Sequence, residues 1–488
     1  MNKTKKWMSA LAIAAMSLMG GQTYADPING MTAFEISKLM YAGWNVGNSL
    51  DATKDNYFGL DTETAWGNPK ITKKMIDNVH NSGFRTLRVP VSWGQHTKAE
   101  GGYQYKIDEA WLKRVKEVVD YGIDNDMFVI LNIHHDNGSQ WNHPYFWPSN
   151  NTKDQSVRYV TEIWTQVSEY FKDYDQRLIF ETLNEPRVIG DSNEWWFWPV
   201  DNPQQSKVVE AMGVINAMNQ AALDAIRNNG SAANKDRMVL VPGYDASPDG
   251  ALTNKFTLPT DQTPDRIGIE VHAYRPTELC LTGDRLYFQE SDKQTIRDVL
   301  SPLYDRYVKQ QIPVVIDETS ISDKGQGDAT RFQWFEAFYS IAQGFEMPCV
   351  LWDNGTTWET YQRGLKEGWS DPNTNGECHG FMNRYTGEWN QPQMIAKIME
   401  VLGDAPTADV VDVELAEMAV VNNAGVLSVA KGGVGLMMNQ IVMFDTKGQL
   451  VLVESNKENV HVSSLVPGLY FVVIATPEGN VKTKVVLN

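Results

Sequence analysis

The architecture of this chain can be read from two segments, Leu178-Ile179-Phe180-Glu181-Thr182-Leu183-Asn184-Glu185-Pro186 and Pro313-Val314-Val315-Ile316-Asp317-Glu318. Each holds a short apolar run of the length of a buried strand, and each run leads to a carboxylate, Glu185 or Glu318. Strands that are apolar on both faces are typical of parallel sheets covered by helices. We therefore expect two buried parallel strands that carry acids at their carboxyl ends.

Six further segments have the same character, and amphipathic stretches of helical periodicity separate them. The eight predicted strands are Tyr41 to Asn48, Thr86 to Trp93, Phe128 to His135, Leu178 to Glu185, Arg237 to Tyr244, Ile267 to Tyr274, Pro313 to Thr319 and Cys349 to Asn354. The predicted helices include Asp108 to Asp126, Asp154 to Tyr174, Pro203 to Arg227, Ser291 to Gln310 and Asp328 to Gln343.

Strand and helix alternation counted to eight predicts a (β/α)8 TIM barrel over residues 26–402, and an open doubly wound sheet is the competing fold. Polar and aromatic residues recur at the strand ends: Arg88, His134, His135, Asn184, Glu185, His272, Tyr274, Glu318 and Trp352. Only a closed barrel brings the ends of all eight strands to one place. These side chains therefore favour the barrel.

The first 25 residues have the pattern of a signal peptide. Lys3, Lys5 and Lys6 precede an apolar stretch from Trp7 to Met19, and Ala25 offers a cleavage site. That stretch is short for a membrane anchor, the alternative interpretation. We expect a protein that is secreted or held at the cell surface.

The charge and the cysteine content exclude several classes of partner and fold. A formal net charge of −18 disfavours nucleic acid and acidic polysaccharides, because both are negatively charged. Three cysteines among 488 residues cannot form a disulfide framework. A neutral partner and an ordinary hydrophobic core are expected.

The composition changes after Leu402. Residues 403–409 read as a linker, and residues 410–488 read as a small β-sandwich. Its predicted strands are Asn439 to Asp445, Gln449 to Glu454, Val460 to Ser463, Gly468 to Ala475 and Val481 to Leu487. None of the 16 tryptophans lies beyond Trp389, which disfavours a sugar-binding module in this tail.

The tail resembles the C-terminal sorting domain of the Por (type IX) secretion system. The resemblance rests on Val442-Met443-Phe444-Asp445-Thr446-Lys447-Gly448 and on Leu465-Val466-Pro467-Gly468-Leu469-Tyr470-Phe471-Val472-Val473. It implies secretion machinery as a partner, and a passive structural module is the alternative.

Two opposed carboxylic acids, one protonated and one ionised, are the minimal equipment for cleaving a glycosidic bond. Motifs in the barrel segment extend this interpretation, because together they resemble glycoside hydrolase family 5, and within it the bacterial endoglucanases. They are Gly43-Trp44-Asn45-Val46-Gly47-Asn48-Ser49-Leu50-Asp51, Arg85-Thr86-Leu87-Arg88-Val89-Pro90-Val91-Ser92-Trp93, Ile130-Leu131-Asn132-Ile133-His134-His135-Asp136, Asn184-Glu185-Pro186, His272-Ala273-Tyr274 and Trp352.

The resemblance implies that Glu185 is the general acid/base and Glu318 the nucleophile of a retaining hydrolase, with no metal or organic cofactor. We expect burial and the nearby negative charge to raise the pKa of Glu185, so that it holds a proton. By the same resemblance, Arg88 would orient Glu318, and Asn184 would bind the sugar 2-hydroxyl.

The other predicted substrate-binding residues are His134, His135, His272, Tyr274, Trp352 and Asn48. The resemblance places His134 and His135 at the cleavage subsite, and Trp352 as a platform for a sugar ring. His272 and Tyr274 lie two apart, hence on one face of a strand beside the nucleophile. The two adjacent histidines show no zinc-type spacing with a third ligand, and Asn48 is as readily a turn-capping residue.

One position departs from the family pattern. Asp317 stands where the family usually has glycine, and strand alternation would point it away from Glu318, toward the helices. A lone buried carboxylate there is costly unless it is paired.

The sequence therefore predicts an endo-acting retaining β-1,4-glucanase, and we expect a monomer. Xyloglucan, mixed-linkage glucan, xylan and mannan remain open as backbones. The alternative from another class is a glycan-binding barrel that does not hydrolyse its ligand.

Overall fold

The computed structural model describes residue 28 and residues 30–54, 59–137, 145–367, 376–406, 418–423, 426–431, 434–444, 450–476 and 479–487. The chain divides into two compact units, Met1–Ala408 and Asp409–Asn488. The predicted signal peptide and residues 407–409 of the predicted linker lie outside the described residues.

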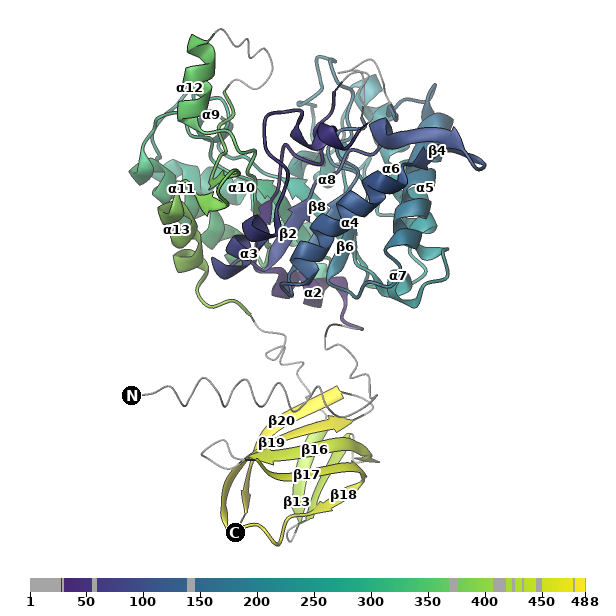
Figure 1. The fold of residues 1–488 in the computed structure, drawn as a ribbon, viewed down its shortest axis with the longest axis vertical. Helices are drawn as coiled ribbons and strands as arrows, with labels where there is room; N and C mark the ends of the chain where they lie inside the picture. The colour runs from purple at the N-terminus through teal and green to yellow at the C-terminus, as the bar shows by residue number, and fades with distance from the viewer. Residues whose placement is uncertain are drawn as a thin grey trace. The chain divides into compact units, whose positions relative to one another are not determined.

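The first unit is a closed barrel of eight parallel strands in the order β1-β10-β9-β8-β7-β6-β5-β2, which confirms the predicted fold (Figure 1). Each predicted strand segment contributes one strand, or stave, of the barrel. The staves are β1 (Ala42–Asn45), β2 (Thr86–Val89), β5 (Phe128–Asn132), β6 (Leu178–Glu181), β7 (Val239–Pro242), β8 (Ile267–His272), β9 (Val314–Thr319) and β10 (Cys349–Leu351).

Helices surround the barrel (Figure 1), and their apolar faces supply the outer core. In α4 (Glu109–Ile123), Asp108 caps the first turn by accepting from the backbone N–H groups of Ala110 and Trp111. The buried residues of α4 recur three or four apart, as a helix on a sheet requires. The other helices are α2 (Ala33–Met40), α3 (Lys73–Asn81), α5 (Lys153–Tyr170), α6 (Ser206–Arg227), α7 (Ala232–Asp236), α8 (Pro248–Leu252), α9 (Thr277–Cys280), α10 (Glu290–Arg306), α11 (Asp328–Gly344), α12 (Trp358–Lys366) and α13 (Pro392–Leu402).

Short elements decorate the loops of the barrel. They are the hairpin β3 (Thr97–Glu100) and β4 (Tyr103–Ile107), the pair β11 (Met382–Asn383) and β12 (Glu388–Trp389), and the 3-10 turns η1 (Leu60–Thr64), η2 (Gly94–His96), η3 (Tyr244–Ala246) and η4 (Val308–Gln310). Among the described residues, no helix is both long and apolar enough to cross a membrane. Cys280 and Cys349 are buried free thiols, and Cys378 is buried as well.

Part of the barrel interior is polar. Asn45 on β1 is in register with Arg88 on β2, and Asn132 on β5 is in register with Glu181 on β6. All four residues are fully buried, and hydrogen bonds join them. The staves therefore enclose a layer of charged and amide side chains that supports the residues at the strand ends.

The second unit is the predicted β-sandwich of two four-stranded sheets. One sheet holds β13 (Met418–Asn423), β14 (Val426–Lys431), β15 (Val434–Leu436) and β18 (Asn459–His461); the other holds β16 (Met438–Phe444), β17 (Leu450–Lys457), β19 (Gly468–Thr476) and β20 (Gly479–Leu487). Both sheets contribute to one core, for example through Leu427 and Ile474. The strands β13, β14 and β15 precede the first strand predicted for this tail, and they were not predicted from the sequence.

The two units have separate hydrophobic cores, because no described residue belongs to both core clusters. A chain that ends at Ala408 should therefore fold and unfold cooperatively at the melting temperature of the barrel in the full chain. Differential scanning calorimetry of the two proteins tests this. A truncated chain that aggregates, or that melts well below the full chain, would show that the barrel needs the second unit.

Candidate active site

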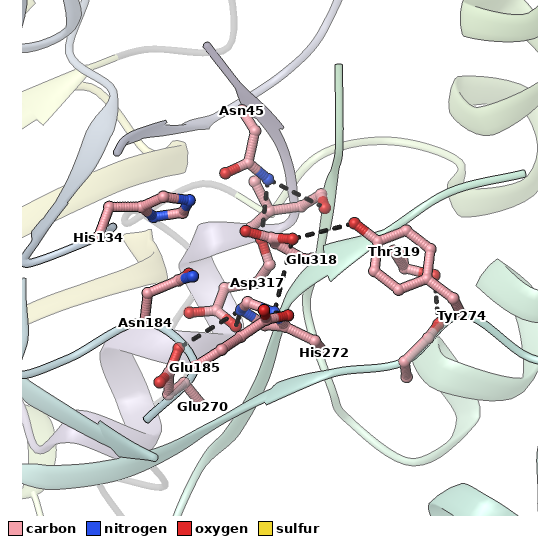
Figure 2. A network of polar contacts seen from close by, with 12 residues as sticks. Asn45, His134, Asn184, Glu185, Glu270, His272, Tyr274, Asp317, Glu318 and Thr319 are labelled. Carbon is pink, nitrogen blue, oxygen red and sulfur yellow. Dashed lines mark hydrogen bonds and ion pairs between the residues drawn. The ribbon is translucent and has the colours of Figure 1, made fainter. Parts of the chain in front are cut away.

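The site lies at the carboxyl ends of the barrel strands, where Glu185 and Glu318 meet (Figure 2). Glu318 belongs to β9, and Glu185 follows β6 after a short connection. One carboxylate oxygen of each acid and one ring nitrogen of His272 all lie within 4.8 Å of one another. This spacing suits direct attack on a sugar by one acid while the other handles a proton, because retaining glycosidases hold their carboxyl groups about 5 to 5.5 Å apart.

His272, the last residue of β8, stands between the two acids. Its Nδ1 is 2.7 Å from Oε1 of Glu185 and 3.5 Å from Oε2 of Glu318. Burial lowers the pKa of His272, but the surrounding carboxylates outweigh it and raise that pKa to about 9. The imidazole is therefore a cation at neutral pH and donates its Nδ1 proton to Glu185.

The protonation of Glu185 differs from the prediction. Burial raises its pKa as expected, yet the hydrogen bond from His272 and the charges of His272 and Arg187 bring the pKa down to about 2. The pKa of Glu318 is instead raised, by burial and by the charge of Glu185, against the pull of His272 and Arg88. Negative neighbours alone would raise the pKa of Glu185. The positive charge that His272 acquires between the two acids lowers that pKa, and the prediction did not include it.

Arg88 holds Glu318 from the barrel interior. Its Nη1 donates to Oε1 of Glu318 at 2.6 Å and to Asn45. Its Nε and Nη2 bind both oxygens of Glu181 at 2.7 Å, and Nη2 also donates to Asn184 at 2.8 Å. All five N–H donors are thereby used, and the residue is fully buried. Arg88 is therefore a positioning residue rather than a contact for substrate, and it binds both Glu318, its predicted partner, and a second barrel carboxylate, Glu181.

Asp317 does not point toward the helices, so that expectation is wrong. Along β8, Val271 pairs with Ile316 and the next residue, His272, pairs with Glu318. The pairing of β9 with β10 also skips a residue over this interval. The extra residue makes a β-bulge, which breaks the strict alternation of side chains. Asp317 therefore lies inside the barrel, 3.6 Å from both Arg88 and His272.

Tyr274 and Asn184 flank the acids (Figure 2). The Tyr274 hydroxyl donates to Oε2 of Glu318 at 3.0 Å. The Asn184 side chain is nearly buried, and its Oδ1 accepts from Arg88. That bond fixes the amide, so that Nδ2 is left as the donor on the opposite side.

His134 and Trp352 pack together at the ends of β5 and β10. Their rings lie nearly parallel, with centroids 6.0 Å apart. Nδ1 of His134 is 3.0 Å from Asn132, and burial lowers the pKa of His134 well below its usual value, so the imidazole is neutral. Trp352 is only 7% exposed, so little of its ring is open to solvent.

His135 and Asn48 both adjoin Asp51. The His135 ring packs against Trp66, and its Nε2 is 3.7 Å from Asp51. One carboxylate oxygen of Asp51 lies within 4.8 Å of a ring nitrogen of both His134 and His135. The sequence did not reveal this third group beside the two histidines. Its carboxylate accepts from the backbone N–H groups of Asn48 and Ser49, and Asn48 has a positive φ of 54°. Asn48 thus sits in a tight turn, in line with the alternative interpretation of that residue.

Sequence reasoning missed four interior residues, Asn45, Asn132, Glu181 and Glu270. A signal was present for the two acids. Glu181 lies four residues before Glu185, and Glu270 lies two before His272, so strand periodicity places each on the face of a predicted site residue. A charged residue inside an apolar strand should have been counted with the site.

The loop after Glu185 carries three exposed tryptophans, Trp195, Trp196 and Trp198. The guanidinium of Arg187 lies 4.0 Å from the ring of Trp195, and Arg187 also contacts Glu185 at 3.3 Å. Arg275, next to Tyr274, lies 5.7 Å from the ring of Trp196. Two of the exposed rings therefore contact arginines that adjoin Glu185 and Tyr274.

Comparison with known proteins identifies the family. Residues 49–357 match the model of cellulase (glycosyl hydrolase family 5), and residues 406–488 match the secretion system C-terminal sorting domain. Endoglucanase A of Clostridium longisporum is 36% identical over 390 residues, which cover 78% of this chain and 68% of that protein. Endoglucanase 1 of Ruminococcus albus is 34% identical over 76% of this chain and 81% of its own length.

Solved structures agree with these matches. A broad-specificity family 5 endoglucanase from Ruminococcus champanellensis with bound cellotriose is 37% identical, with a TM-score of 0.65 over 76% of this chain and 98% of that one. A family 5 lichenase from a Caldicellulosiruptor species in complex with cellotetraose is 34% identical, with a TM-score of 0.68 over 79% and 99%. The chain belongs to glycoside hydrolase family 5 and ends in a secretion sorting domain.

Proposed function

We propose that this protein is a secreted endo-β-1,4-glucanase that cleaves internal bonds of cellulose-type glucans with retention of configuration. The observation that carries the proposal is the approach of Glu185 and Glu318 to within 4.8 Å at the open end of the barrel. Both acids sit in fixed positions, one against His272 and the other against Arg88 and Tyr274.

Glu318 is the nucleophile in this proposal. Arg88 and Tyr274 donate to its two different oxygens, which orients the carboxylate and stabilises its ionised form. It attacks the anomeric carbon, and the bond to the leaving sugar breaks as that sugar oxygen takes a proton from Glu185. Water assisted by Glu185 then hydrolyses the glycosyl ester.

The proton that Glu185 delivers is stored on His272 in the free protein. The two residues share one proton along a 2.7 Å hydrogen bond, and His272 holds it because its pKa is the higher of the two. Transfer along that bond gives a protonated Glu185 beside a neutral His272. When Glu318 is esterified its negative charge disappears, so His272 holds a proton less strongly and Glu185 can act as the base.

The remaining predicted residues supply sugar contacts. The Nδ2 group of Asn184 is the donor for the 2-hydroxyl, a contact that strengthens in the transition state. His134 and Trp352, whose rings lie side by side, would border the same site. The exposed Trp195, Trp196 and Trp198 extend the cleft with aromatic surface suited to further sugar rings.

Related solved proteins hold cellotriose and cellotetraose, which supports a β-glucan as substrate. A non-hydrolysing glycan-binding barrel is disfavoured, because both acids and the buried arginine network are present together. The sorting domain indicates export to the exterior or the cell surface. We propose that residues 1–25 are the signal peptide that begins this export and that the mature enzyme is a monomer.

Replacing Glu318 with alanine should lower the rate of carboxymethyl-cellulose hydrolysis by roughly 10⁴-fold or more. Rate losses of this size are typical when a covalent nucleophile is removed. Added azide should restore part of the activity toward an activated aryl cellobioside, because a small anion fits the space of the lost carboxylate. Glu63→Ala is the matched control: it removes another buried carboxylate bound to an arginine, Arg114, away from the site. Undiminished activity of Glu318→Ala would overturn the assignment.

The pH profile of kcat/KM should be bell-shaped. The acid limb should lie above the ordinary pKa of a glutamate, because the pKa of Glu318 is raised. The alkaline limb should fall near pH 9, where His272 loses the proton that it shares with Glu185. The raised pKa of His272 also contributes stability that is complete below pH about 6.5 and is lost as the pH rises through about 9. An alkaline limb below pH 7 would contradict this proton inventory.

Trp196→Ala should raise KM for cellohexaose by about 5- to 10-fold, as expected from the loss of one stacked ring worth about 1 kcal/mol. It should leave kcat/KM for a short aryl cellobioside unchanged, because in this proposal the Trp196 ring binds a distal sugar that only the longer substrate has. Tyr385→Ala, which removes an exposed aromatic from the β11–β12 turn, is the control and should change neither. Equal kinetics of Trp196→Ala and wild type on both substrates would show that this ring takes no part in binding.

A further inference from the structure

Two buried acids lie behind the active site, Glu270 on β8 and Asp317 on β9. Both side chains are fully buried, yet none of their four carboxylate oxygens accepts a hydrogen bond from the described residues. Glu181 in the same interior contrasts with them, because Arg88 and Asn132 donate to its two oxygens. A buried carboxylate without a donor is costly, so the ionised state of both acids at once is strongly disfavoured.

The two acids face each other across neighbouring strands. An oxygen of Glu270, an oxygen of Asp317 and a nitrogen of His272 lie within 4.8 Å of one another. The β9 bulge is what brings Asp317 into the barrel beside Glu270. Two carboxylates at this distance in a buried site hold one proton between them, since like charges there cannot both persist.

We propose that Glu270 and Asp317 form a proton-sharing dyad whose single negative charge keeps His272 protonated and thereby sets the upper pH limit at which Glu185 can act. The inference rests on the proposed function and deepens it. The dyad would act through His272 without touching the sugar, so its members are positioning residues.

The geometry of His272 connects the dyad to the cleft. Its Nε2 lies 3.7 Å from Glu270 and 3.6 Å from Asp317, and Nδ1 on the other side of the ring contacts Glu185 and Glu318. Nε2 is buried and has no hydrogen-bond partner among the described residues, so its contact there is one of charge. In support, burial first and the neighbouring acids next raise the pKa of Glu270 well above its usual value and that of Asp317 to about 7.

Other charges around His272 do not replace the dyad. Glu181 is neutralised by its two-pronged contact with Arg88, and Asp245 of η3 stands nearer to Arg187 and Glu185. The titratable and charged groups that face the ring or its partners are Arg88 from β2, Glu181, Glu185 and Arg187 from β6 and its loop, Asp245 from η3, Glu270 and Tyr274 from β8 and its end, Asp317 and Glu318 from β9, and His134 and His135 after β5. Among these described groups, Glu270 and Asp317 are the ones within 4 Å of Nε2.

The test compares Glu270→Gln with the double variant Glu270→Gln/Asp317→Asn. The single change imitates a protonated Glu270 and leaves one charge on Asp317, whereas the double change removes the dyad charge altogether. The alkaline limb of kcat/KM should move to lower pH by about one unit or more in the double variant, as expected when an opposite charge at this distance is lost. It should move much less in Glu270→Gln.

Direct titration of His272 separates this idea from the proposed function. NMR of the eight histidines, with the His272 signal assigned through His272→Gln, gives the pKa of the ring whether or not the protein hydrolyses glucan. That pKa should fall in the double variant. Absence of hydrolysis in the wild type would overturn the proposed function alone. An unshifted His272 in the double variant, or an equal shift in the single variant, would overturn the dyad.

One control variant and one alternative measurement address folding. Glu63→Gln removes a buried carboxylate that is paired with Arg114, and it should lower the melting temperature without moving the alkaline limb. Should the double variant fail to fold, infrared difference spectra at pH 7 between wild type and each single variant decide the matter. Each single variant should lose the carbonyl band of one protonated carboxylic acid. A wild type without that band would contradict the shared proton.

Discussion

The buried guanidinium of Arg88 is the interaction on which the rest of the site depends. It is a full positive charge without access to water, and it is stable there because five donors meet Glu181, Glu318, Asn45 and Asn184. These partners come from three parts of the barrel wall: β1, β6 with the segment after it, and β9. A single planar group thus ties the proposed nucleophile, Glu318, to the strands, and it also fixes the amide of Asn184 next to the proposed acid/base, Glu185.

This arrangement explains why the barrel interior is polar where a purely structural barrel would be apolar. Charges buried in a protein must be compensated, and here Arg88 and His272 are balanced by the carboxylates around them. This layer lies directly beneath Glu185 and Glu318 at the carboxyl ends of the strands. The protonation of Glu185 therefore depends on His272, whose own charge is set by the carboxylates around it.

Much of the fold and the positions of the acids could be predicted from sequence, because both rest on local patterns. Eight apolar runs gave eight staves, and Glu185, Glu318, His272 and Tyr274 came together since the ends of parallel strands must meet. Orientation and charge could not be predicted in the same way. The bulge that turns Asp317 inward depends on pairing with two neighbouring strands, and the low pKa of Glu185 depends on a histidine 87 positions away. The strands β13 to β15 were not predicted from the sequence.

Covalent trapping tests the central claim most directly. A 2-deoxy-2-fluoro cellobioside with a good leaving group should inactivate the enzyme, and peptide mass spectrometry should locate one added disaccharide on Glu318, with the anomeric configuration of normal products retained. Attachment of the sugar to another residue, or products of inverted configuration, would contradict an account in which Arg88 holds Glu318 as the nucleophile opposite Glu185.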